Sequence, residues 1–204
     1  MGNNNSVQLD RFWTIPNILS IIRVFMILPI VNLLKTNTPQ SNFTAFILIA
    51  LAYFTDFLDG YIARVTKSTS KVGQILDPIG DKLLAITIAA VLYMGKRMPF
   101  YLFILIFLRD LIIALGAIYA MNAKKMIMLP LLSGKITTFC LGFVLGFYPL
   151  KYSFLMNSIP LGRVISKIVC YGTYLVSALL ILSGILYAVN YSRSFLNQRK
   201  SNIN

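Results

Sequence analysis

The chain has 204 residues, 57% of them hydrophobic, and 19 Lys and Arg residues against six acidic ones give a formal net charge of +13. A mean hydropathy of +0.75 excludes an ordinary soluble globule and predicts an all-α integral membrane protein, with one domain over residues 1–204. The sequence has no histidine and both cysteines lie in apolar stretches, so zinc centres and Ser-His-Asp chemistry are excluded.

The apolar segments predict six transmembrane helices, since a span needs about 20 apolar residues. They cover approximately residues 14–34, 43–63, 76–95, 98–121, 134–149 and 166–190. An even number of spans places both termini on one side, and the Lys and Arg bias predicts that this side is cytoplasmic. The N-terminus lacks the Arg- and Ser-rich pattern of a transit peptide, so we expect a bacterial cytoplasmic (inner) membrane.

Two features of the fifth and sixth spans concern packing. Cys140 and Cys170 are predicted to be small core residues and not a disulfide. The motif Gly142-x-x-x-Gly146 allows another helix to approach closely. That helix could belong to the same protomer or to a second copy in a homodimer, and the sequence leaves both possibilities open.

Four of the six acids, Asp56, Asp59, Asp77 and Asp81, cluster at the end of the second span and the start of the third. Each pair is three or four residues apart, so its members share one helix face, and both pairs meet at one membrane edge. An ionised Asp inside a span costs about 2.5–3.5 kcal/mol, which requires a cationic partner. Carboxylates suit Mg²⁺ or Mn²⁺, and two such ions form a clamp for a diphosphate. An ion pathway or a structural salt-bridge cluster is the alternative interpretation.

The spacing Asp56-x2-Asp59-Gly60-x2-Ala63-Arg64-x8-Gly73-x3-Asp77-x3-Asp81 resembles the signature of the CDP-alcohol phosphotransferase (phosphatidyltransferase) family at all its positions. The resemblance implies a metal-dependent enzyme with its active site at the cytoplasmic ends of the second and third helices. An acceptor hydroxyl attacks CDP-diacylglycerol there, and CMP leaves. By position, the four aspartates resemble the ligands of a pair of Mg²⁺ or Mn²⁺ ions, and Asp81 doubles as general base. The residues that resemble the CDP-lipid site are Gly60, Ala63, Arg64 and Gly73.

The acceptor is predicted from other polar residues in the spans. Asn17, Ser20 and Arg23 share a helix face, in a segment similar to the opening of bacterial phosphatidylglycerophosphate synthases. Arg109 and Lys135 are candidate cations for the phosphate of glycerol 3-phosphate. We therefore expect CDP-diacylglycerol and glycerol 3-phosphate as substrates, in phospholipid biosynthesis.

Two alternatives to this function stay open. Arg109-Asp110 is similar to cardiolipin synthases of the same family, which use phosphatidylglycerol as acceptor. A non-enzymatic transporter or ion pathway through the aspartates is the alternative in a different class. The expected partners are the lipid bilayer and a second copy in a homodimer, and not nucleic acid.

Overall fold

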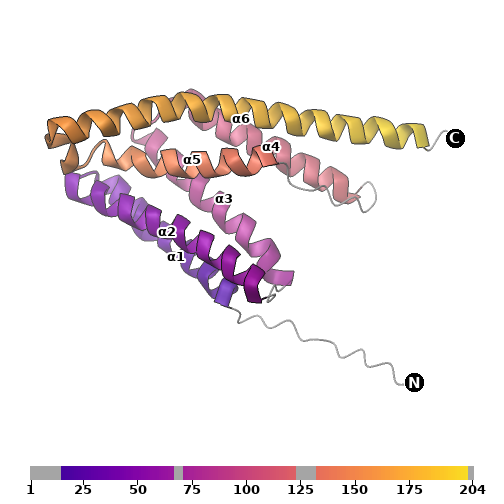
Figure 1. The fold of residues 1–204 in the computed structure, drawn as a ribbon, viewed down its shortest axis with the longest axis horizontal. Coiled ribbons are helices and arrows are strands. Elements are labelled where there is room, and N and C mark those ends of the chain that lie inside the picture. The colour runs from indigo at the N-terminus through magenta and orange to yellow at the C-terminus, as the bar shows by residue number, and fades with distance from the viewer. Residues whose placement is uncertain (1–14, 67–70, 123–131, 202–204) are drawn as a thin grey trace, which may run out of the picture.

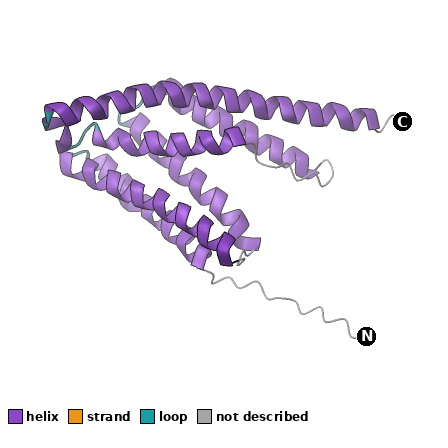
Figure 2. Cartoon of the chain, viewed as in Figure 1, coloured by secondary structure: helices purple, strands orange, loops and turns teal. Residues whose placement is uncertain are grey.

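The computed structural model describes the backbone of residues 15–66, 71–122 and 132–201, and the side chains of residues 21–55, 80, 82–116 and 132–192. Within these ranges the regular secondary structure is all helical, with short turns between the helices (Figure 2). The helices are α1 (Ile15–Thr36), α2 (Pro39–Thr66), α3 (Lys71–Met94), α4 (Phe100–Asn122), α5 (Leu132–Leu150), the short 3₁₀ helix η1 (Phe154–Asn157) and α6 (Ile159–Ser201).

Each predicted span coincides with one α-helix, so the all-α prediction is confirmed for the described residues. The largest difference is α6, which has 43 residues where the apolar run predicted 166–190. The helix continues beyond that run because backbone hydrogen bonds do not need apolar side chains, and Pro160 in its first turn is tolerated there. Among the described residues, one helix segment, Ile159–Ser192, is long and apolar enough to cross a membrane, with a mean hydropathy of 2.0 over an 18-residue window.

The helices form two groups that diverge from a common end (Figure 1). Helix α1 packs against α2 and α3, α6 packs against α4 and α5, and α5 also contacts α2. Every α-helix contributes to one apolar core, and its fully buried side chains include Ile30, Leu34, Ile49, Leu84, Ile88, Leu92, Leu102, Leu145 and Leu180. Close van der Waals packing of these side chains helps to hold the two groups together, because lipid tails are as apolar as the core and burial from lipid gives little hydrophobic gain.

Arg97 joins the three turns that meet at this common end, which we call the Arg97 end. Its Nη1 donates to Asn37 Oδ1 at 3.1 Å and to Asn42 Oδ1 at 3.0 Å, and its Nη2 donates to the Leu34 carbonyl. The guanidinium also lies 5.7 Å from the centre of the Tyr152 ring, within cation–π range. Asn42 in turn donates to the Tyr152 carbonyl at 3.2 Å. Burial lowers the pKa of Arg97 from its ordinary value. The guanidinium has five N–H donors in a fixed planar arrangement, so it can bind several acceptors at once.

The turn between α1 and α2 is set by its own polar side chains. Asn37 has a φ of 54°, the left-handed conformation that asparagine adopts more readily than most residues at a helix C-terminus. Thr38 and Ser41 then cap α2 reciprocally: the Thr38 N–H donates to Ser41 Oγ at 2.9 Å, and the Ser41 N–H donates to Thr38 Oγ1 at 3.1 Å. These local bonds fix the first turn of α2 and so place Asn42 within hydrogen-bond distance of Arg97.

The two glycines of α5 face α2 of the same protomer. A Cβ added at Gly142 would lie 2.8 Å from Tyr53 Cε1, and one added at Gly146 would lie 3.6 Å from Ile49 Cγ2. The close-packing motif therefore serves an internal helix contact, which resolves one of the two possibilities left open by the sequence. Cys140 and Cys170 are both free thiols, so the prediction of no disulfide is confirmed. Cys140 is partly buried but Cys170 is exposed, so the prediction that Cys170 is a core residue is wrong: its position on α6 faces outward.

We predict that Gly142→Ala destabilises the protein by about 1–3 kcal/mol, because the new methyl group overpacks the contact with Tyr53. The measurement is thermal unfolding of the purified protein in a neutral detergent. Gly184→Ala is the matched control: its Cβ would meet no heavy atom within 4 Å, and alanine favours a helix over glycine by about 1 kcal/mol. An unchanged melting temperature for Gly142→Ala would contradict the contact between α2 and α5.

Candidate functional site

The predicted signature residues fall on the converging parts of two helices. Asp56, Asp59, Gly60, Ala63 and Arg64 belong to α2, and Gly73, Asp77 and Asp81 belong to α3. Their side chains lie outside the described residues. The backbone is helical at all four aspartates, so about one turn separates the members of each pair. The last turns of α2, the first turns of α3 and the start of α1 lie at the same end of the molecule (Figure 1).

Helix α1 brings a buried cation to this part of α3. A Cβ added at Gly80 would lie 3.8 Å from Val24 Cγ2, so α1 runs beside the turn of α3 that separates Asp77 from Asp81. The neighbour of Val24, Arg23, is only 1% exposed. The predicted residues Asn17 and Ser20 also belong to α1, and their side chains lie outside the described residues. The Arg23 turn is therefore positioned next to two of the predicted metal ligands.

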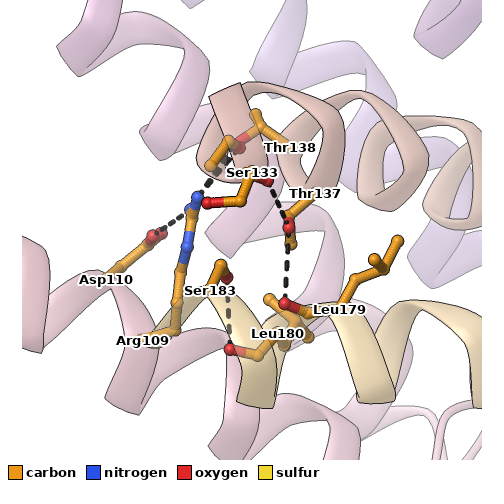
Figure 3. A network of polar contacts seen from close by, with 9 residues as sticks. Arg109, Asp110, Ser133, Thr137, Thr138, Leu179, Leu180 and Ser183 are labelled. Atoms are coloured by element: carbon orange, nitrogen blue, oxygen red, sulfur yellow. Dashed lines mark hydrogen bonds and ion pairs between the residues drawn. The ribbon is translucent and has the colours of Figure 1, made fainter. Parts of the chain in front are cut away.

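Arg109 is one of the two candidate acceptor cations, and its side chain is bonded to other residues of the protein (Figure 3). Its Nη1 lies 2.8 Å from Asp110 Oδ1, and the side chains of this ion pair are 8% and 13% exposed. Its Nη2 donates to the Gly134 carbonyl at 3.1 Å and to Thr138 Oγ1 at 3.3 Å. Both terminal nitrogens of the guanidinium thus have protein acceptors, and Arg109 connects α4 to the first turns of α5.

Lys135, the other candidate cation, differs from Arg109 in its surroundings. Its side chain is exposed, and it follows Gly134, whose carbonyl Arg109 holds. It lies in the first turn of α5, where backbone N–H groups and the helix dipole favour an anion. The Ser133 hydroxyl beside it is buried and has no hydrogen-bond partner within the described part of the chain. Lys135 therefore remains available to a ligand, and Arg109 fixes the turn that carries it.

The first turns of α5 are also held by α6. Thr137 Oγ1 donates to the Ser133 carbonyl at 2.8 Å and lies 3.4 Å from the Leu179 carbonyl, as Figure 3 shows. The Tyr187 ring fills the space beside Gly134, where an added Cβ would lie 2.4 Å from its hydroxyl oxygen. Sequence reasoning missed Tyr187, and the only signal for it is a glycine placed where a helix begins.

Tyr191 makes the equivalent contact with α4. A Cβ added at Gly116 would lie 2.1 Å from its ring, and its hydroxyl lies 3.5 Å from the Ile113 carbonyl. The rings of Tyr187 and Tyr191 stack at a centroid distance of 6.2 Å. Two successive turns of α6 therefore set the positions of α4 and α5 near Arg109.

The chemistry of the donor set fits a hard divalent cation. Oxygen ligands from carboxylates are what Mg²⁺ and Mn²⁺ prefer, and α2 and α3 together carry four aspartates. Elsewhere, among the side chains that the structure describes, there is no group of three His, Cys, Asp or Glu residues that could hold a metal. The signature residues on α2 and α3 are thus the candidate metal centre.

A helical bundle with paired aspartates on two neighbouring helices and cations on α1 and α5 is suited to a substrate that carries phosphate groups. The sequence matches the family described as CDP-alcohol phosphatidyltransferase over residues 13–188. The chain belongs to this family, which is membrane-associated, and the resemblance predicted from the signature is confirmed.

Individual relatives fall into two named groups. A CDP-diacylglycerol--glycerol-3-phosphate 3-phosphatidyltransferase of Cereibacter sphaeroides is 43% identical over 84 residues, 41% of this chain and 38% of the relative. The Rickettsia bellii protein of the same name is 43% identical over 70 residues, 34% of this chain and 39% of the relative. A cardiolipin synthase (CMP-forming) of Streptomyces coelicolor is 35% identical over 107 residues, 51% of this chain and 50% of the relative. The matched segments thus span between 38% and 50% of the length of these curated relatives.

Proposed function

We propose that this chain is an integral membrane enzyme that transfers a phosphatidyl group from CDP-diacylglycerol to glycerol 3-phosphate, releasing CMP and forming phosphatidylglycerophosphate. The complete eight-residue signature on α2 and α3 is the observation that carries this proposal. Family membership over residues 13–188 and the names of the Cereibacter and Rickettsia relatives support it.

In the proposed reaction, the acceptor hydroxyl attacks the phosphorus on the lipid side of the diphosphate. A new phosphorus–oxygen bond forms as the bond to CMP breaks, and Asp81 accepts the hydroxyl proton. Gly60, Ala63, Arg64 and Gly73 hold the nucleotide and its diphosphate. The four aspartates would hold two Mg²⁺ or Mn²⁺ ions, which would neutralise the charge of the diphosphate and of the leaving CMP.

The acceptor site is proposed to lie between the α1 and α5 cations. Lys135 is exposed in the first turn of α5 and binds the phosphate of glycerol 3-phosphate with the help of the helix N-terminus. Arg109 positions that turn through the Gly134 carbonyl. Asn17, Ser20 and Arg23, which all belong to α1, are proposed as further acceptor-binding residues.

The proposal places all six helices across a bacterial cytoplasmic membrane, with both termini and the aspartates on the cytoplasmic side. The shortest α-helix, α5, has 19 residues, or about 28 Å, close to the thickness of a bilayer core. Large apolar side chains face outward, among them Phe25 at 68%, Phe139 at 76% and Tyr171 at 69% exposure, which suits a lipid environment. We also propose that the protein forms a homodimer, and that its interface does not involve Gly142 and Gly146, which face α2 of the same protomer.

A second candidate function is cardiolipin synthesis, in which phosphatidylglycerol is the acceptor. The pair Arg109-Asp110 and the similarity to the Streptomyces protein over 51% of this chain favour it. The alternative in a different class, a transporter or ion pathway, would release no CMP, and the family match over residues 13–188 argues against it.

We predict that the purified protein releases CMP from CDP-diacylglycerol when glycerol 3-phosphate and Mg²⁺ or Mn²⁺ are present. EDTA abolishes the release and either metal restores it, because the diphosphate charge is then neutralised again. CMP release and the lipid product are measured with glycerol 3-phosphate or phosphatidylglycerol offered separately. Release with phosphatidylglycerol alone identifies a cardiolipin synthase, and release with neither acceptor contradicts both enzymatic proposals.

We predict that Asp81→Asn lowers kcat by about 10³-fold or more, since it removes the proposed general base, and that the variant retains binding of CDP-diacylglycerol. Turnover and equilibrium binding of the CDP-lipid are measured side by side. Asp10→Asn is the matched control, because residue 10 lies outside both the signature and the family match at 13–188. Full activity of Asp81→Asn would rule out its role as base.

We predict that the two candidate acceptor cations affect different quantities: Lys135 affects substrate binding, and Arg109 affects stability. Lys135→Gln raises the KM for glycerol 3-phosphate about 10-fold, equivalent to 1.4 kcal/mol, with little change in melting temperature. Arg109→Gln instead lowers the unfolding free energy by about 3 kcal/mol, because Asp110 loses its buried partner. The double variant Arg109→Gln/Asp110→Asn recovers part of that loss. A stable Arg109→Gln protein with a raised KM would transfer the phosphate-binding role to Arg109.

A further inference from the structure

The Arg97 end carries a group of exposed lysines that the proposed reaction does not use. Lys35, Lys96 and Lys151 are all exposed. Each is the chain neighbour of a residue in the Arg97 cluster: Lys35 follows Leu34, Lys96 precedes Arg97, and Lys151 precedes Tyr152. We call Lys35, Lys96 and Lys151 the lysine triad.

The Arg97 cluster brings the triad together from three distant parts of the chain. Arg97 binds the Leu34 carbonyl and faces the Tyr152 ring, and Asn42 binds the Tyr152 carbonyl at 3.2 Å. The backbone beside each lysine is therefore tied to one buried guanidinium, and Lys96 itself has a φ of 54°. The backbone segments that carry the three lysines are thus held at one end of the molecule by specific contacts of the neighbouring residues.

The segments that meet at this end carry no side-chain carboxylate of their own. The six acids of the sequence are Asp10, Asp56, Asp59, Asp77, Asp81 and Asp110. None of them lies in the segments 34–42, 95–100 or 150–160 that meet here. Arg97 is 8% exposed, and its Nε has no hydrogen-bond partner within the described residues. The four described partners of the Arg97 guanidinium are the Asn37 and Asn42 side-chain oxygens, the Leu34 carbonyl and the Tyr152 ring, and all four are neutral. The described segments at this end therefore carry positive charge without a carboxylate to compensate it.

We propose that the lysine triad binds the phosphate groups of anionic phospholipids in the membrane leaflet opposite the candidate active site. The inference rests on the proposed function only in placing the protein across a bilayer. Flexible lysine side chains extend from helix ends to the headgroup level, where anionic lipids attract them. The buried Arg97 fixes the spacing of the triad and adds a positive potential beneath it. An anionic lipid then supplies the negative charge that the segments at this end lack.

The test is the melting temperature of the full-length protein in neutral detergent, with added phosphatidylglycerol or phosphatidylcholine. We expect phosphatidylglycerol to raise the melting temperature by about 5 °C over phosphatidylcholine. The variant Lys35→Gln/Lys96→Gln/Lys151→Gln loses this difference, and 0.5 M NaCl abolishes it in the unmodified protein because exposed charges are screened. Lys167→Gln, an exposed lysine on α6 outside the triad, keeps the full difference.

Several outcomes would overturn the proposal. Equal melting temperatures with phosphatidylglycerol and with phosphatidylcholine would contradict it directly. An unchanged lipid effect in the triple variant assigns the binding elsewhere, including to the candidate active site, and an equal loss in Lys167→Gln shows that any surface cation suffices. If the triple variant does not fold, Lys96→Gln alone with bound lipid counted by native mass spectrometry replaces it, and undiminished lipid binding rejects the site. CMP release is assayed separately, so a failed reaction and a failed lipid site are distinguished.

Discussion

The bonds of a single buried guanidinium determine how the helices of this protein leave their common end. Arg97 contacts the turn between α1 and α2, and with Asn42 it also fixes the segment that precedes η1 and α6. Because the side chain is 8% exposed, its hydrogen bonds are made in a low dielectric, where each lost partner is costly. The directions of the helices follow from this end, and the two groups separate with distance from it (Figure 1).

Away from that end, positions are set by glycines that receive aromatic rings. Tyr53 lies against Gly142, Tyr187 against Gly134 and Tyr191 against Gly116. At each contact one helix has a glycine in place of a larger residue, so a large ring of another helix can fill the space and the two helices pack closely. Tyr53 precedes Asp56 by one turn of α2, and Gly134 precedes Lys135. The same contacts that pack the helices therefore also locate the segments that carry the candidate site.

The sequence predicted the helices well because their apolar runs are long and separated by polar turns. The family could also be predicted from the sequence, since the fixed spacings of Asp, Gly and Arg in the eight-residue signature can be recognised without the tertiary structure. It did not predict that Arg109 is bound to Gly134 and Thr138, nor that Arg97 is buried. Contacts between residues far apart in the chain, such as Asn42 with Tyr152, leave no periodic signal. Residue type and hydropathy are the same for an exposed arginine in a loop and for a buried one, so the sequence alone does not show that Arg97 is buried.

The pairing of small and large residues on facing helices has an evolutionary consequence. A methyl group at Gly116 would occupy the volume of the Tyr191 ring, and one at Gly134 would meet the Tyr187 hydroxyl. A lineage that enlarges either glycine can keep this packing only if the facing tyrosine becomes smaller. Positions 116 and 191, and positions 134 and 187, are thus constrained to vary as pairs, even though more than 50 residues of chain separate the members of each pair.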